Sequence, residues 1–91
     1  MEKLERYLQF MREAERLKNV LRSAHTSAGR PESTAEHTWR LALLALVLAG
    51  EKPELDQQRV LAMCLVHDLG EAYEGDIPAV VALYRQLDQA L

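Results

Sequence analysis

Apolar residues recur every three or four positions along most of the chain, a spacing that predicts helices. Over residues 2–21 charged side chains fill the positions between them, which is typical of an amphipathic packing helix. The apolar residues of this helix are Leu4, Tyr7, Leu8, Met11, Leu17, Val20 and Leu21. Residues 22–33 contain Ser, Thr, Gly and Pro, which indicates a loop. No segment alternates in the way that predicts a strand.

A second helix is predicted to begin at a capping box. Ser33 and Glu36 have the spacing at which each side chain accepts a hydrogen bond from the backbone amide of the other. Residues 39–49 are apolar almost all round, and Gly50 follows as a helix end. We therefore expect this helix at the centre of a bundle, with Trp39 packed in the core.

Two further helices complete the predicted fold. Asp56 can cap a helix over residues 57–69, which Gly70 would end. The acidic segment 71–76, with Gly75, indicates a turn, and Pro78 suits the first turn of a helix over residues 79–90. The expected fold is all-α, a bundle of about four helices in a single domain, residues 1–91.

Composition and charge narrow the function classes. The 91 residues (10.3 kDa) are 48% apolar and 27% charged, which excludes a disordered or low-complexity chain. A net charge of -3 without a basic cluster argues against a nucleic-acid polymer as partner. The single Cys64 excludes an internal disulfide, and the longest apolar run, residues 41–49, is too short to span a membrane. We expect a cytoplasmic protein without a membrane partner.

Histidines beside carboxylates at predicted helix ends are the candidate chemistry. His37 follows Glu36 in a first helical turn, where the helix dipole favours the neutral imidazole that binds metals. His67 and Asp68 stand together at the end of the third predicted helix. Two imidazoles and a carboxylate suit Mn, Co, Fe, Ni or Zn. A histidine at a helix end is more often a hydrogen-bonded cap, so spacing leaves both interpretations open.

Two segments together resemble the HD-domain phosphohydrolases, and within them the 5'-deoxynucleotidases of bacteria and eukaryotes. They are residues 32–37, Glu-Ser-Thr-Ala-Glu-His, and residues 67–78, His-Asp-Leu-Gly-Glu-Ala-Tyr-Glu-Gly-Asp-Ile-Pro. Residues 17–22 match the start of that branch, so the resemblance covers nearly the whole chain. It implies an HD-domain-like helical bundle in which a divalent metal ion, Mn, Co, Fe, Ni, Zn or Mg, is bound by His37, His67 and Asp68.

The resemblance also implies roles for four further residues. Glu71 and Asp76 would be the catalytic carboxylates that activate water or protonate the leaving oxygen. Arg22 would bind the substrate phosphate, and Arg30 would add a second cation. Without the resemblance, the commoner roles of such residues are helix caps, solvated acids and surface ion pairs.

The sequence departs from this family in two respects. The family's last metal ligand is an aspartate on a later helix, and the only aspartate here after Asp76 is Asp88, on the immediately following helix. We therefore expect the chain to be the N-terminal part of the family's full domain. The deoxynucleotidases carry a tryptophan where this chain has Ser23, so selectivity for deoxyribose is not predicted.

The sequence thus predicts a metal-dependent phosphohydrolase that acts on a nucleoside 5'-monophosphate or a related small phosphomonoester, an enzyme of the 5'-nucleotidase type. The alternative is a non-catalytic metal-binding or oligomerisation module with an incomplete site, and a helical adaptor without metal is a third reading. A homodimer is expected, since the last helix would otherwise expose Val80, Val81, Leu83 and Leu87.

Overall fold

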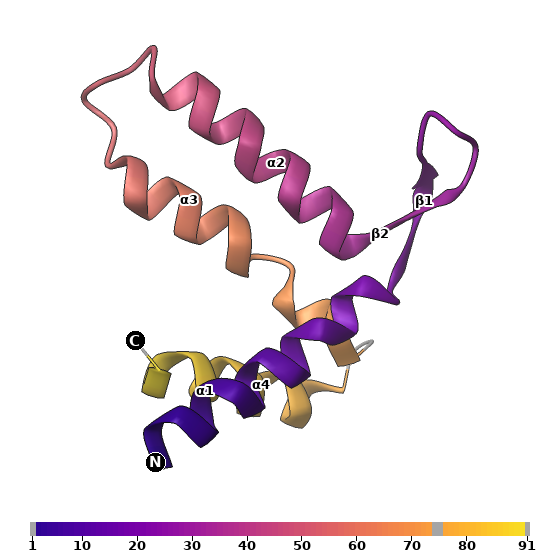
Figure 1. The fold of residues 1–91 in the computed structure, drawn as a ribbon, viewed down its shortest axis with the longest axis vertical. Coiled ribbons are helices and arrows are strands. Elements are labelled where there is room, and N and C mark those ends of the chain that lie inside the picture. The colour runs from indigo at the N-terminus through magenta and orange to yellow at the C-terminus, as the bar shows by residue number, and fades with distance from the viewer. Residues whose placement is uncertain (1, 74–75, 91) are drawn as a thin grey trace.

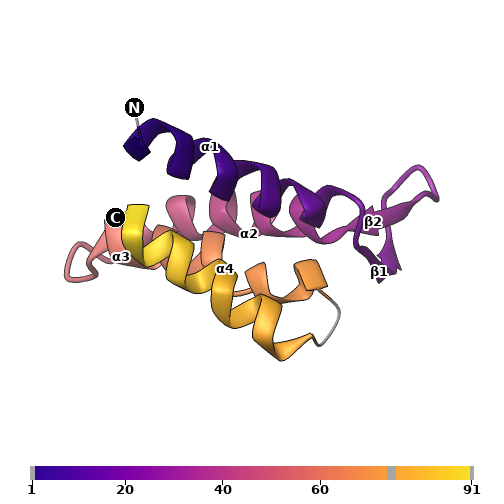
Figure 2. The ribbon, with the colours of Figure 1, turned by 90° about the horizontal axis from the view of Figure 1, so that it is seen from below.

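The computed structural model describes residues 2–73 and 76–90 and is mostly helical, as predicted. Helix α1 lies beside α4, whereas α2 and α3 form an antiparallel pair that extends away from them (Figure 1). A small β-hairpin projects beyond the start of α2 (Figure 2). In chain order the elements are α1 (Glu2–Ala14), the 3₁₀ helix η1 (Glu15–Lys18), β1 (Leu21–His25), β2 (Pro31–Ser33), α2 (Thr34–Ala49), α3 (Gln57–Val66), the 3₁₀ helix η2 (Leu69–Tyr73) and α4 (Ile77–Ala90).

The core lies where the two 3₁₀ helices meet α4. Leu17 of η1, Leu69 and Ala72 of η2, and Leu83 of α4 are buried together, and Leu83 is fully enclosed. The Tyr84 hydroxyl donates a hydrogen bond to the Val66 carbonyl at 2.9 Å, which ties α4 to the end of α3. The core is therefore small, and it sits directly behind the turn that follows α3.

The third helix ends earlier than predicted. It stops at Val66, the chain turns at His67 and Asp68, and η2 begins at Leu69. Gly70 does not end a helix but lies within η2, where a Cβ atom would come 3.3 Å from Cγ1 of Val80. This contact is tight, because η2 packs closely on α4, and any larger residue would require the Val80 side chain to shift. The turn predicted at Gly75 lies outside the described residues.

The predicted loop over residues 22–33 is wrong, as is the continuation of the first helix to Leu21. β1 pairs with β2 in antiparallel fashion, with Leu21 opposite Ser33, and Gly29 takes a positive φ of 87° in the connecting turn. The Thr34 amide donates to the Val20 carbonyl at 2.7 Å, so the chain leaves the helical path before the hairpin. β1 is largely exposed, and β2 has just three residues, from exposed Pro31 to buried Ser33, so neither strand shows the apolar alternation that would have predicted it.

The predicted caps are confirmed. The Ser33 hydroxyl accepts from the Glu36 amide at 3.2 Å, and Oε1 of Glu36 accepts from the Ser33 amide at 2.8 Å. Asp56 caps α3 by accepting from the Arg59 amide at 3.1 Å. Hydrogen bonds from the Arg30 guanidinium and from Ser33 lower the pKa of Glu36 from 4.5 to about 2.

Helix α2 is not the central helix that its apolar sequence predicts. Among its residues Thr34, Thr38 and Ala49 are buried, and Trp39 is 64% exposed rather than packed in the core. The exposed residues Trp39, Leu43, Leu44, Leu46, Val47 and Leu48 are called here the α2 apolar surface. The chain exposes 6924 Å², whereas a folded monomer of this mass exposes about 5,400 Å². Within residues 2–73 and 76–90, no helix has the length and apolar character needed to cross a membrane.

Leu83→Ala should lower the free energy of unfolding by about 2–5 kcal/mol, because it leaves a cavity in the core. The matched control is Leu55→Ala, the same change at a residue 45% exposed in the α2–α3 connection, and it should have a much smaller effect. Urea unfolding followed by circular dichroism measures both. Equal losses in the two variants would contradict this placement of the core.

The capping box should make stability depend on pH. The folded-state pKa of Glu36 is below its ordinary value, so its stabilising contribution is complete above pH 4.5 and is lost as the pH falls toward about 2. The difference in unfolding free energy between the natural protein and Glu36→Gln should shrink over this interval. Glu54→Gln, an exposed carboxylate of the connection, is the control. A difference that stays constant with pH would contradict the assignment.

Candidate metal centre

The structure brings His37, His67 and Asp68 together. His37 lies in the first turn of α2, and the other two form the turn after α3. One possible ligand atom from each residue lies within 4.8 Å of the other two. Oδ2 of Asp68 is 2.9 Å from Nε2 of His67 and 4.0 Å from Nε2 of His37. Both imidazole rings therefore direct Nε2 toward the same carboxylate oxygen.

These distances fit a shared divalent ion. Donors that each lie about 2.1 Å from an ion are about 3.0 Å apart when adjacent and about 4.2 Å apart when opposite. The separations of 2.9 and 4.0 Å from Oδ2 of Asp68 are of the size found between donors to one ion. Two imidazole nitrogens and one carboxylate oxygen are a donor set that suits first-row divalent metals. The residues present therefore fit a metal ion.

A hydrogen bond on the far side of His67 supports this interpretation. Its Nδ1 lies 2.9 Å from the Cys64 carbonyl oxygen, an acceptor, so the proton of the neutral ring is on Nδ1. The lone pair of Nε2 then faces the carboxylate oxygen of Asp68. A cation between these atoms, or a second proton on the ring, removes their repulsion.

Glu71 is held against the start of α2. Its Oε2 accepts a hydrogen bond from the hydroxyl of Thr34 at 3.0 Å, and Thr34 is fully buried one turn before His37. The Glu71 amide also donates to the Asp68 carbonyl at 3.0 Å. No local sequence pattern marks Thr34 as a site residue, because its partner lies 37 positions away.

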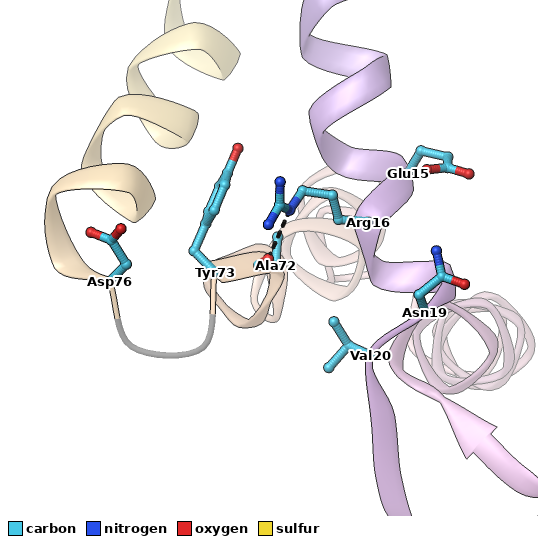
Figure 3. Close-up of a pocket in the computed structure, with 7 residues that line it drawn as sticks. All are labelled: Glu15, Arg16, Asn19, Val20, Ala72, Tyr73 and Asp76. Carbon is cyan, nitrogen blue, oxygen red and sulfur yellow. Dashed lines mark hydrogen bonds between the residues drawn. The ribbon is translucent and has the colours of Figure 1, made fainter.

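Asp76, the other predicted catalytic carboxylate, is not in the metal cluster. Its Oδ1 accepts from the Ala79 amide at 3.2 Å and so caps α4. It borders a hollow of about 440 Å³ in which Nε of Arg16 donates to the Ala72 carbonyl at 3.0 Å (Figure 3). The Arg16 guanidinium also lies 4.5 Å from the centre of the Tyr73 ring. Burial and the hydrogen bond to Glu13 raise the pKa of Tyr73.

The two predicted phosphate-binding arginines have different surroundings. Nε of Arg22 is buried and lies 3.2 Å from Oε1 of Glu32, in an ion pair without hydrogen-bond alignment. Arg30 is exposed and makes two hydrogen bonds to the carboxylate of Glu36, one of 3.0 Å. The same Oε1 of Glu32 lies 3.9 Å from Nδ1 of His37. Glu32 was part of the motif quoted from the sequence but had not been given a role.

The chain is similar in sequence to several known proteins. The chain is 38% identical over 72 residues to the 5'-deoxynucleotidase HDDC2 of Homo sapiens, a match that covers 77% of this chain and 34% of that protein. It is 36% identical over 78 residues to the protein of the same name from Dictyostelium discoideum, covering 77% and 41%. For the 5'-deoxynucleotidase hdd1 of Schizosaccharomyces pombe the identity is 34% over 64 residues, covering 68% and 31%.

The chain thus spans about a third of the length of these relatives, and no solved structure matches it. The family model described as HD domain matches residues 14–90, which include every residue of the cluster. The chain belongs to the HD domain family.

Proposed function

We propose that the protein is a metal-dependent phosphohydrolase that acts on nucleoside 5'-monophosphates or a related small phosphomonoester. The observation that supports this most is the convergence of Nε2 of His37 and Nε2 of His67 on one carboxylate oxygen of Asp68. This cluster lies in an HD domain whose relatives are named 5'-deoxynucleotidases. The proposal does not specify ribose or deoxyribose, because this chain has Ser23 where the deoxynucleotidases carry tryptophan.

In the proposed reaction His37, His67 and Asp68 hold the ion. When bound, a divalent ion neutralises phosphate charge and lowers the pKa of water to about 7. Glu71 accepts the proton of the attacking water, and its hydrogen bond to Thr34 keeps its carboxylate in place.

The remaining residues of the site act on the phosphate and the leaving group. The Arg22 guanidinium neutralises the phosphate, because Nε faces Glu32 and the terminal nitrogens are left for phosphate oxygens. Oδ1 of Asp76 is engaged in the cap of α4, so Oδ2 is the atom assigned to anchor or protonate the leaving oxygen. Arg30 adds a second cation only when it releases Glu36.

Protein loaded with Mn or Co should release inorganic phosphate from nucleoside 5'-monophosphates. The double variant His67→Ala, Asp68→Ala should reduce the rate to that of metal-free protein, because two of the three donors are lost. His25→Ala is the matched control, since His25 is an exposed histidine of β1 outside the cluster, and it should leave the rate unchanged. Full activity in the double variant would rule out the proposed site.

A non-catalytic metal-binding module is the second candidate. In the part of the chain that the structure describes, the metal cluster supplies three donors, which is fewer than a closed site holds. Elemental analysis together with a panel of mononucleotides distinguishes the candidates. Bound metal without hydrolysis of any of them would favour the module over the enzyme.

The expectation that the last helix exposes its apolar residues is wrong for Leu83, which is fully buried in the core, whereas Val81 is 42% exposed. We propose instead that a second copy of the chain covers the α2 apolar surface. The area exposed beyond that of a typical folded monomer is about 1,500 Å², which is within the range that each partner buries in an obligate dimer. A hollow of about 790 Å³ continues this surface between α1, α2 and α3, and residues such as Leu8, Met11, Leu17, Trp39 and Leu65 line it. Charges of both signs, Arg12, Glu15 and Lys18, also border it and could pair across a two-fold contact.

Light scattering at micromolar concentration should therefore give the mass of a dimer. Leu44→Glu combined with Val47→Glu should give a monomer, because two charges would be buried in the interface. Leu21→Glu, at an equally exposed leucine of β1, is the control that should remain dimeric. Circular dichroism checks that the variants keep their helices. A natural chain that is monomeric at this concentration would contradict the proposal.

A further inference from the structure

We infer that Glu32 is a positioning residue that fixes His37 for the metal ion and Arg22 for the phosphate. This inference rests on the proposed function for the roles of those two residues. Oε1 of Glu32 lies 3.2 Å from Nε of Arg22 and 3.9 Å from Nδ1 of His37. One carboxylate oxygen thus stands between the predicted phosphate-binding group and a metal-binding ring.

The fold places Glu32 in this position. Leu21 lies opposite Ser33 in the hairpin, so Arg22 and Glu32 are the next residues on their respective strands. His37 lies in the first turn of α2, directly after β2. The Glu32 side chain is only 16% exposed, and those of Arg22 and His37 are about a third exposed. An ion pair in this setting is screened less by solvent than one on the open surface.

The Glu32 carboxylate lies on the side of His37 where a metal-binding histidine usually has the partner of its second ring nitrogen. A histidine that binds a metal through one nitrogen usually directs the N–H of the other toward a carboxylate or a carbonyl, which fixes the ring and its tautomer. His67 meets this requirement with the Cys64 carbonyl. For His37 the group on the Nδ1 side is the Glu32 carboxylate, and Nε2 is then left for the ion beside Asp68.

Glu36 is the carboxylate nearest to His37 in the sequence, but it has a different task. Its oxygens accept from the Ser33 amide and from the Arg30 guanidinium. The motif therefore holds two glutamates, one that caps the helix and one that faces the site. Substituting each glutamate in turn therefore compares the loss of a helix cap with the loss of the carboxylate that faces His37.

Titration with Co(II), followed by its absorption spectrum and by calorimetry, tests the contact with His37. Glu32→Gln should weaken Co(II) binding about 10–100-fold and alter the spectrum, because a neutral amide would replace the carboxylate that lies 3.9 Å from Nδ1 of the His37 ring. Glu36→Gln should unfold more easily yet bind Co(II) as the natural protein does. Natural-protein affinity in Glu32→Gln would overturn the inference. This readout needs no turnover, so it holds or fails independently of the hydrolase proposal.

A variant of Arg22, the other residue that Glu32 contacts, distinguishes the positioning of His37 from general support of the hairpin. Arg22→Gln removes the ion pair but leaves the Glu32 carboxylate facing His37, so Co(II) affinity should stay as in the natural protein. An equal loss of Co(II) affinity in Arg22→Gln and Glu32→Gln would show that the ion pair acts only by holding the hairpin, and would overturn the inference. Where the protein hydrolyses a mononucleotide, Glu32→Gln should raise KM and weaken inhibition by inorganic phosphate. These effects should be less than additive with those of Arg22→Gln.

Discussion

The pair of reciprocal hydrogen bonds between Ser33 and Glu36 marks the start of α2, the helix that brings His37 and Thr34 to the site. It fixes the residue at which α2 begins, and the direction of each side chain in the first helical turn follows from that start. His37 projects toward Asp68, and buried Thr34 reaches Glu71, because the helix begins where it does. A helix that began one residue later would rotate both side chains by about 100°.

The early end of α3 is the complementary feature. In a continuous helix His67 and Asp68 would point in directions about 100° apart. His67 keeps helical backbone angles (φ -63°, ψ -30°), so the two side chains leave the backbone in different directions and meet between them, where Oδ2 of Asp68 is 2.9 Å from Nε2 of His67. The Cys64 carbonyl in the last turn of α3 is the partner of the His67 ring. The site is therefore made from the start of one helix and the end of the next, and the core behind η2 keeps the two segments together.

Features determined by neighbouring residues could be predicted from the sequence. Both caps and the four helices depend on short motifs whose geometry is local. The candidate ligands are different, because 30 positions separate His37 from His67 and its neighbour Asp68, and they could be predicted only through the resemblance to the HD-domain phosphohydrolases. The hairpin could not be predicted, since its two short strands pair through backbone groups and β1 has no alternating apolar pattern. The exposure of Trp39 could not be predicted for a different reason. An apolar helix surface indicates that the helix packs against another element, but it does not tell whether that element belongs to the same chain. Likewise Glu32 and Thr34 have partners that only the folded chain brings near.

Gly70 stands between Asp68 and Glu71, at the point where η2 touches Val80 of α4. The backbone between Asp68 and the predicted general base Glu71 thus passes a residue whose missing side chain lets η2 lie close to α4. The packing of η2 on α4 and the spacing of the two acidic residues are therefore linked through this one position. A methyl group here would come 3.3 Å from Cγ1 of Val80, so the Val80 side chain would have to shift by a few tenths of an ångström.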